Sequence, residues 1–329
     1  MSERARLQEM ITGFRLSAAL GVAAELGLSD QLAAGPRTLD DLADAVSADP
    51  DTLGRLLRAL ATVGVYDEQD DGRWAVTELA EGLRSDVPGT LRPLARTLSS
   101  PALWAAYGHL GHSVRTGENA FEARHGTDVW THRSRHPEEN AVFNQNMTAL
   151  TSVVAEGVAT AYDFSGVSTV VDVGGGQGQL LEAVLLRHDH LSGTVLDLEH
   201  VVATEPRSAE LAPRWRSVSG SFFDEVPAAD AYLVKSILHD WPDDRCVEIL
   251  RTCRRSLTPD GVVLVIERVL GRSGFEREAA FSDLNMLVMP GGRERTEAEY
   301  AALFEAAGLR LHRVIDTPSR MSVLEARAA

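Results

Sequence analysis

The sequence predicts an α/β protein in which a doubly wound, mostly parallel sheet follows an N-terminal helical domain. From residue 169 onward, short β-branched runs alternate with stretches of helical periodicity, which is the pattern of strands connected by helices. Before that point the apolar spacing is mostly helical. A length of 329 residues suggests about two domains. We expect a winged-helix-like domain at 1–100, a helical linker at 101–160 and the sheet domain at 161–329.

The helices of the first domain are predicted from periodicity and from capping signals. Apolar residues at near-helical spacing predict one helix over residues 8–26. Thr38 and Asp41 have the spacing of a capping box and predict the start of a second helix. Asp49 is a good N-cap and Pro50 suits the first position of a third helix.

A hairpin completes this domain, and the net charge of the whole domain indicates which function it can have. Residues 65–76 place two short β runs on either side of an Asp-Asp-Gly turn, so helix, helix, helix and hairpin follow in the order of a winged helix. Residues 1–100 contain 10 Arg and 16 Asp or Glu, a net charge of 10 − 16 = −6. The third helix would offer only Arg55 and Arg58 to the phosphates of DNA, whereas a DNA-binding helix normally makes several such contacts. We therefore favour a structural or dimerisation domain over a DNA-binding domain.

The second half predicts seven strands and the helices between them. Helices are expected from Leu180, over residues 243–256, and from the Thr296–Glu299 capping box to Gly308, and a turn is expected at 258–261. The strand candidates are residues 170–173, 193–196, a run ending near 218, 231–234, 262–266, 309–314 and 322–326.

Polar residues follow five successive strands at the ends where ligands bind in such sheets. One polar residue at a strand end is uninformative, but five in succession predict a site beyond the carboxyl edge of the sheet. They are Asp172 with the glycines after it, Asp197, Ser221, the group Lys235, His239 and Asp240, and Glu267.

The glycine-rich turn discriminates between two classes of nucleotide cofactor. The dinucleotide fingerprint requires a third glycine five residues after Gly174, where this chain has Gln179. Asp172 stands two residues before Gly174, where its carboxylate would repel a pyrophosphate and attract a cation. S-adenosylmethionine (SAM) carries an ammonium and a sulfonium group and no phosphate. We therefore favour SAM over NAD, and Asp197 would accept the ribose hydroxyls in either case.

Five motifs in a fixed order resemble one enzyme family over nearly the whole chain. They are DVGGGQG at 172–178, LDLEHV at 196–201, GSFFD at 220–224, KSILHDWP at 235–242 and PGGRERT at 290–296. This set resembles the SAM-dependent O-methyltransferases of the plant caffeate type, and in particular their bacterial relatives that modify aromatic polyketides and similar secondary metabolites. The resemblance implies a Rossmann-like SAM-methyltransferase sheet behind a winged-helix-like dimerisation domain, and hence a homodimer.

The resemblance also implies a cofactor site. Gly174 would lie at the methionine moiety and Asp197 at the ribose, with Gly176 and Leu198 as further cofactor-binding residues. Ser221 and Phe222 would lie beside the adenine. The remaining cofactor residues would be Asp172, Lys235 and Ser236, the last two near the sulfonium and carboxylate end. The family usually has Asp where this chain has Ser221, which removes one charge from the adenine site.

For catalysis the resemblance implies His239 as the general base, flanked by Glu267 and Glu294. The acceptor would be a small aromatic metabolite with a phenolic hydroxyl. Asn285, Met286 and Met289 match the stretch that lines the family's acceptor pocket. In the linker at 101–160, we expect a minority of the aromatic and Met residues to reach the same pocket, namely Trp104, Phe143 and Met147.

Composition excludes several other classes of protein. The net charge is 32 − 48 = −16, which disfavours binding to nucleic acid. We expect no membrane segment, and the two cysteines indicate a reduced compartment, so a cytoplasmic location is expected. We expect no metal ion, because a histidine base makes one unnecessary. N-methylation or hydroxylation by a SAM-binding relative remains the main alternative, followed by a non-catalytic regulator.

Overall fold

The computed structural model describes residues 2–202, 205–272 and 276–329. The chain forms two compact units. Unit 1 contains residues Met1–Trp104 and Pro137–Ala149, and unit 2 contains Ala105–His136 and Leu150–Ala329. Among the described residues, no helix is long and apolar enough to cross a membrane.

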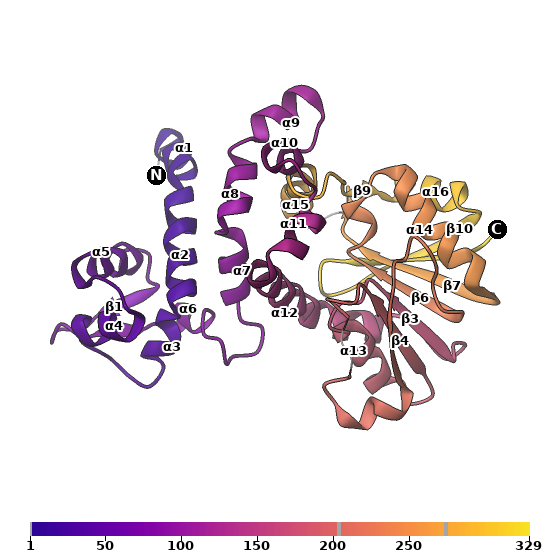
Figure 1. The fold of residues 1–329 in the computed structure, drawn as a ribbon, viewed down its shortest axis with the longest axis horizontal. Coiled ribbons are helices and arrows are strands. Elements are labelled where there is room, and N and C mark those ends of the chain that lie inside the picture. The colour runs from indigo at the N-terminus through magenta and orange to yellow at the C-terminus, as the bar shows by residue number, and fades with distance from the viewer. Residues whose placement is uncertain (1, 203–204, 273–275) are drawn as a thin grey trace. The chain divides into compact units, whose positions relative to one another are not determined.

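Unit 1 contains the expected three helices and hairpin, with additional short helices. The Thr38 hydroxyl accepts a hydrogen bond from the Asp41 amide, and the Asp49 carboxylate accepts one from the Thr52 amide, so both predicted N-caps are confirmed. Figure 1 labels most of the elements of this unit. The elements are α1 (Glu3–Thr12), α2 (Phe14–Leu26), α3 (Leu28–Leu32), α4 (Leu39–Val46), α5 (Pro50–Ala61), β1 (Tyr66–Glu68), β2 (Trp74–Val76), α6 (Glu78–Glu81) and α7 (Arg92–Leu98).

The single helix expected over residues 8–26 is wrong in its boundaries. The structure has two helices there, divided at Gly13, and the first one begins at Glu3. The Gly13 amide bonds to the Met10 carbonyl, three residues back, which tightens the chain at this point. The low helix propensity of glycine favours a break at this position. The apolar spacing continues on both sides of Gly13 and therefore did not reveal the break.

The linker consists of helices that divide between the two units. The helices are α8 (Pro101–Tyr107), α9 (Leu110–Thr116), α10 (Ala120–His125), α11 (Val129–Arg135) and α12 (Pro137–Ala161). The first residues of α12 belong to unit 1 and the residues from Leu150 onward to unit 2.

Unit 2 is built on a seven-stranded sheet in the order β10-β11-β7-β6-β3-β4-β5. The five strands from β7 to β5 are parallel, whereas β11 runs antiparallel to both of its neighbours. This confirms the predicted mostly parallel sheet. The strands are β3 (Thr169–Val173), β4 (Ser192–Asp197), β5 (Trp215–Ser219), β6 (Ala229–Lys235), β7 (Leu257–Glu267), β10 (Leu309–Asp316) and β11 (Ser322–Ala328), and β8 (Val269–Leu270) pairs separately with β9 (Arg295–Thr296).

Both faces of this sheet are covered by helices, as Figure 1 shows for α13 on one face and α14 and α16 on the other. Alternate residues along β6 pack into two cores: Leu233 lies among residues of α12 and α13, and Tyr232 lies among residues of α14 and α16. The connecting elements are α13 (Gln179–Arg187), α14 (Asp243–Ser256), α15 (Glu276–Val288), α16 (Glu297–Ala306) and the short 3-10 turns η1 (Ala209–Arg214) and η2 (Leu238–Asp240).

The turn expected at 258–261 is wrong, because β7 begins at Leu257. Ala229 of β6 pairs with Leu257 and Ala231 pairs with Val262, so four residues of β7 stand against one residue of β6. The Thr258 hydroxyl donates to that one residue, Asp230, at 3.0 Å. The segment is therefore an enlarged bulge, held to the neighbouring strand by this hydrogen bond.

Candidate active site

The register of the parallel strands brings the predicted polar residues to one edge of the sheet. Asp172 on β3 pairs with Leu233 on β6, two residues before Lys235. Lys235 pairs with Ile266 on β7, which precedes Glu267. The ends of β3, β6 and β7 are thus level, and side chains that are distant in the sequence meet there.

The glycines after β3 form a loop that other residues would disrupt. Gly174, Gly176 and Gly178 have φ angles of 66°, 58° and 74°, in the left-handed region. A Cβ atom on Gly174 would lie 2.4 Å from Cδ1 of Ile237, and one on Gly178 would lie 2.2 Å from the Trp215 ring. A Cβ atom on Gly176 would meet nothing within 4 Å, so there is open space on that side of its backbone, as the approach of a ligand requires.

Asp197, at the end of β4, is held by this loop. Its carboxylate accepts hydrogen bonds from the amide of Gly176 at 2.8 Å and from the amide of Leu198 at 2.7 Å. Burial raises the pKa of Asp197, although these two bonds and the charge of His200 oppose the shift. A fixed carboxylate here retains lone pairs for a ligand's hydroxyl groups.

Asp172 is a buried carboxylate with an oxygen atom that lacks a partner. Its side chain is 2% exposed, and Oδ2 has no hydrogen-bond partner among the described residues. Burial raises its pKa to about 7, although the charge of Lys235 opposes the shift. Burial lowers the pKa of Lys235, because it disfavours the charged form of a lysine as it does that of a carboxylate. A buried carboxylate that lacks a partner fits a cationic ligand group such as the ammonium of SAM.

Ser221 and Phe222 follow β5 as expected, but their side chains make different contacts. The Ser221 hydroxyl accepts a hydrogen bond from the Phe223 amide at 3.2 Å, so it closes a local turn. The ring of Phe222 would lie 3.5 Å from a Cβ atom on Gly174, which places it beside the glycine loop. Phe222 and Phe223 both pack against the ring of Trp241.

The chain turns sharply after β6, and this turn directs three amides at one carboxylate. Ser236 has a φ of 53°, in the left-handed region that non-glycine residues rarely adopt. The amides of Ile237, Leu238 and His239 then donate to Oε1 of Glu267 at 3.0, 3.0 and 3.4 Å. Glu267 is fully buried, so it fixes the backbone from which the His239 side chain projects.

His239 lies between two buried carboxylates. Its Nδ1 is 3.0 Å from Oε1 of Glu294 and 3.4 Å from Oε2 of Glu267. Burial alone would lower the pKa of His239, but the charges of Glu267, Asp240 and Glu294 raise it to about 10. Nε2 makes no hydrogen bond to a described residue, and its nearest acidic atom is Oδ1 of Asp240 at 3.6 Å. The ring is oriented through one nitrogen and leaves the other one free for proton transfer.

Arg295 was missed by the sequence reasoning, although it lies in the PGGRERT motif. Its guanidinium is 1% exposed and donates to the carbonyls of Leu238 and Trp241 at 2.9 and 2.8 Å. It also forms an ion pair with Asp243 at 2.7 Å. Arg295 therefore secures the backbone on both sides of His239, while its neighbour in sequence, Glu294, bonds to the imidazole.

The residues predicted for the acceptor pocket divide between the two units. Trp104, Phe143 and Met147 belong to unit 1, and the other three belong to unit 2. In unit 2, Met286 and Met289 are buried, and the Asn285 side chain accepts a hydrogen bond from the Tyr107 hydroxyl at 3.1 Å.

Asn119 is a second residue that the sequence reasoning did not single out. Its side chain amide donates to the carbonyls of Leu287 and Met289 at 3.3 and 3.1 Å. It thereby ties the start of α10 to the end of α15. An Asn that N-caps a six-residue helix gives no sequence signal for this second contact.

His239, Glu267 and Glu294 are also the one group of described residues whose ligand atoms lie close enough to hold a metal ion, all within 4.8 Å. The nitrogen that faces both carboxylates is already hydrogen-bonded to Glu294, which in turn accepts from Ser282 at 2.6 Å. Oε1 of Glu267 also accepts hydrogen bonds, from backbone amides, whereas Oε2 of Glu267 and Oε2 of Glu294 are buried without a hydrogen-bond partner among the described residues. Two buried carboxylates beside one ring nitrogen suit a protonated imidazole.

A parallel sheet that carries a glycine loop, an unpartnered buried carboxylate and an acid-flanked histidine at one edge defines an α/β enzyme with a nucleotide-type site and acid–base capacity. The model of the O-methyltransferase domain matches residues 107–310, and that of the O-methyltransferase dimerisation domain matches residues 8–86. The chain belongs to this O-methyltransferase family. It is a SAM-dependent O-methyltransferase, with the fold that the sequence predicted.

Two curated relatives illustrate the range of this family. The phenazine O-methyltransferase PhzM of Lysobacter antibioticus is 41% identical over 325 residues, covering 98% of this chain and 95% of that protein. The 8-amino-8-demethylriboflavin N,N-dimethyltransferase of Streptomyces davaonensis is 32% identical over 330 residues, covering 98% and 94%. The family thus includes an N-methyltransferase.

Solved structures give the same result. The crystal structure of LaPhzM has a TM-score of 0.96 and 40% identity and covers 100% of both chains. The O-methyltransferase NcsB1 from neocarzinostatin biosynthesis, solved with SAM and 2-hydroxy-5-methyl naphthoic acid, has a TM-score of 0.81 and 38% identity and covers 95% of this chain and 96% of that one.

Proposed function

We propose that this enzyme methylates a phenolic hydroxyl of a small aromatic secondary metabolite, with His239 as the general base. The observation that carries the proposal is the geometry of the imidazole: Nδ1 is hydrogen-bonded to Glu294, whereas Nε2 makes no hydrogen bond to a described residue and lies 3.6 Å from Oδ1 of Asp240. The aromatic acceptors in the names of the relatives support the choice of substrate class.

The chemistry divides between the cofactor and this chain's residues. SAM, when bound, supplies an electrophilic methyl group on a good leaving group, so the protein mainly has to position the acceptor and remove its proton. A phenol has a pKa near 10, and a neutral histidine of ordinary pKa would be a weak base toward it. The carboxylates of Glu267, Asp240 and Glu294 raise the pKa of His239 to about 10, against the effect of burial. Proton transfer from the acceptor to Nε2 then becomes nearly thermoneutral.

For the cofactor, we propose the residues that the resemblance implied. Asp172 would bind the ammonium group, and Gly174 and Gly176 would contact the methionine moiety through their backbone. The rest of the site would be Asp197 and Leu198 at the ribose, Ser221 and Phe222 at the adenine, and Lys235 and Ser236 near the sulfonium and carboxylate end. The unpartnered oxygen of Asp172 and the open space at Gly176 support this assignment.

For the acceptor pocket, we propose Asn285, Met286 and Met289 from α15. Trp104, Phe143 and Met147 remain candidates from the linker. The functional division at 1–100, 101–160 and 161–329 belongs to the same proposal, with the middle segment supplying part of the acceptor pocket.

N-methylation is the alternative that a relative's activity brings forward. A neutral amine attacks through its own lone pair before it loses a proton, so it has little need of a base with a raised pKa. The acid-flanked His239 therefore favours a hydroxyl acceptor. Hydroxylation is a further alternative, and product mass spectrometry separates these reactions by the site and the mass of the added group.

The decisive experiment compares the wild type with His239→Gln on a panel of phenols and their aniline counterparts. We expect methylated phenols from the wild type and a loss of about 10²–10⁴-fold in kcat for the variant. Binding of S-adenosylhomocysteine to both proteins, measured by calorimetry, serves as the control for folding. Equal turnover of phenols by the two proteins would contradict the role of His239, and exclusive turnover of anilines would contradict the acceptor class.

We also propose that the enzyme is a homodimer assembled through its N-terminal domain. Four large apolar side chains of α1 and α2 are more than half exposed: Leu7 at 58%, Met10 at 67%, Ile11 at 67% and Phe14 at 56%. A stripe of this kind is typical of a protein interface. Light scattering on the wild type and on Met10→Glu/Ile11→Glu tests it, with a dimer expected for the first and a monomer for the second.

A further inference from the structure

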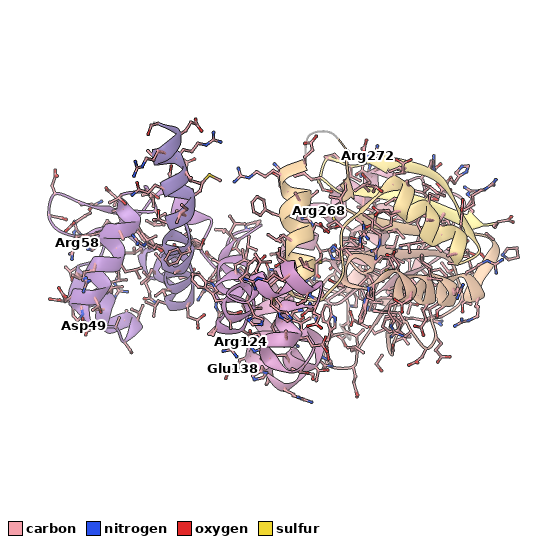
Figure 2. The ribbon with its side chains drawn as sticks, turned by 90° about the horizontal axis from the view of Figure 1, so that it is seen from above. Asp49, Arg58, Arg124, Glu138, Arg268 and Arg272 are labelled. Atoms are coloured by element: carbon pink, nitrogen blue, oxygen red, sulfur yellow. The ribbon has the colours of Figure 1, made fainter. Side chains whose placement is uncertain are left out.

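A pocket of about 380 Å³ opens between the segment that follows β7, the start of α15 and the turn between β10 and β11. Figure 2 labels two of its arginines, Arg268 and Arg272. All residues that line it belong to unit 2, and none comes from the glycine loop or from the ends of β4 and β5. Its lining residues are Arg268, Val269, Arg272, Glu278, Ala279, Asp316, Thr317, Arg320, Met321 and Ser322.

Two of the three arginines in this pocket are neutralised by acids. Arg272 pairs with Glu297 at 3.0 Å and with Asp316 at 2.8 Å. Arg320 pairs with Glu278 at 2.8 Å. These ion pairs are partly exposed and give the rim of the pocket little net charge.

Arg268 differs, because it has no ion pair or hydrogen bond with a described residue. It is only partly exposed and directly follows Glu267 at the end of β7. Its charge reaches the catalytic groups. Burial lowers the pKa of Lys235, and Arg268 lowers it further. Burial would raise the pKa of Glu294, but the bond from His239 and the charges of His239 and Arg268 bring it below its ordinary value.

The pocket is also close to the proposed base along α15. Glu278 and Ala279 lie one helical turn before Ser282, whose hydroxyl donates to Glu294. Four residues of a helix span about 6 Å. The pocket therefore shares helix α15 with the residue that supports the base.

We propose that Arg268 binds a carboxylate of the acceptor, so that the enzyme selects hydroxylated aromatic acids. This inference rests on the proposed function and specifies its substrate class. A guanidinium binds a carboxylate with two parallel hydrogen bonds, and the partly buried, otherwise uncompensated charge makes that pairing favourable. NcsB1, whose structure contains a naphthoic acid, is a family member that receives such a ligand.

A carboxylate could also come from the methionine end of SAM. The pocket's lining argues for the acceptor, because it shares α15 with the proposed acceptor residues and includes none of the proposed cofactor residues. The experiment separates the two sources by measuring S-adenosylhomocysteine binding in the same variants.

The test uses 6-hydroxy-2-naphthoate, 6-hydroxy-2-naphthamide and 2-naphthol as probes. Each is titrated into protein saturated with S-adenosylhomocysteine, and each is assayed for methylation with SAM. The variants are Arg268→Gln and Arg268→Lys. The matched control is Arg310→Gln, which removes one positive charge from an exposed position on β10.

We expect the wild type to bind the acid about 10- to 100-fold more tightly than the amide, the effect of a charged hydrogen-bonded pair. Arg268→Gln should abolish this preference and leave the amide's Kd unchanged, Arg268→Lys should retain part of it, and Arg310→Gln should retain all of it. An unchanged acid-to-amide ratio in Arg268→Gln would overturn the proposal. So would a loss of S-adenosylhomocysteine affinity without a change in that ratio, which would assign Arg268 to the cofactor.

The same data separate this inference from the proposed function. If the amide and 2-naphthol are bound and methylated as well as the acid, the proposed function stands and the carboxylate site fails. If none of the three is bound or methylated while S-adenosylhomocysteine binds, both proposals fail together.

Discussion

Oε1 of Glu294 lies 3.0 Å from Nδ1 of His239 and accepts a second hydrogen bond from the Ser282 hydroxyl at 2.6 Å. The carboxylate is therefore fixed from two directions, and the imidazole ring has one favoured orientation. The amide of Glu294 itself donates to Asp283 at 2.9 Å, so α15 supports both the side chain and the backbone of this residue. This relationship leads to the first two predictions.

The rate of methyl transfer should rise with pH over a range well above that of an ordinary histidine. Burial opposes the shift, but Glu267, Asp240 and Glu294 raise the pKa of His239 from 6.5 to about 10. The base acts only when neutral, so kcat/KM should increase through this region. A profile that is flat from pH 7 to 10 would argue against His239. Since this pKa is raised in the folded state, the contribution of His239 to stability is full below pH 6.5 and is lost as the pH approaches 10.

Glu294→Gln should lower both the rate and the pH at which it rises. The substitution removes one negative charge beside Nδ1 and retains a hydrogen-bonding group of similar size. We expect kcat to fall about 10- to 1,000-fold and the inflection of the pH profile to move to lower pH. Glu305→Gln, at an exposed position on α16, is the control and should leave the profile unchanged.

Arg295→Met should destabilise the protein and slow catalysis without weakening cofactor binding. The variant leaves the carbonyls of Leu238 and Trp241 without this donor, at a cost of about 2–4 kcal/mol in the free energy of unfolding. Urea unfolding measures the loss, and a lower kcat with unchanged affinity for S-adenosylhomocysteine identifies a positioning role. Arg293→Met, which breaks the exposed pair with Glu299, should cost less than about 1 kcal/mol.

Asp172→Asn should weaken cofactor binding about tenfold or more, because the ammonium group loses its anionic partner. The unliganded protein should melt at the same temperature or higher, since burial raises the pKa of Asp172 to about 7 and leaves Oδ2 without a hydrogen-bond partner among the described residues. The rise in Tm on addition of S-adenosylhomocysteine should shrink. Asp260→Asn, on the exposed bulge of β7, is the control. A variant with wild-type affinity would remove Asp172 from the cofactor site.

Removal of divalent metals should leave the activity unchanged. The ligand atoms of His239, Glu267 and Glu294 lie within 4.8 Å of one another, but Nδ1 of His239 and one oxygen of each carboxylate are engaged in protein hydrogen bonds. Assays after treatment with EDTA, and after addition of Zn²⁺ or Mg²⁺, test this. A loss on chelation that one metal restores would assign the cluster to that ion.

The sequence was most informative where a residue's role depends on its neighbours along the chain. The caps at Thr38 and Asp49, the bounds of α14 and the glycine loop after β3 all follow from local spacing and steric requirements. The cluster of polar residues at the sheet edge followed from the rule that parallel strands end together.

The sequence was least informative where a contact joins distant segments. Arg295 and Asn119 serve the site through backbone carbonyls, which carry no sequence signature. The break at Gly13 and the bulge in β7 depend on how the chain packs rather than on apolar spacing.

Helix α15 both supports the carboxylate behind the proposed base and lines the pocket, which constrains redesign of the enzyme. Ser282 on this helix steadies the carboxylate behind His239, while Ala279 lines the pocket one turn earlier and Met286 is buried one turn later. A substitution that tilts or shifts the helix to admit a new acceptor would also move the support of the base. New acceptor selectivity should therefore be sought through side chains that change size or charge without moving the helix axis, and Ala279 is the first position at which to try.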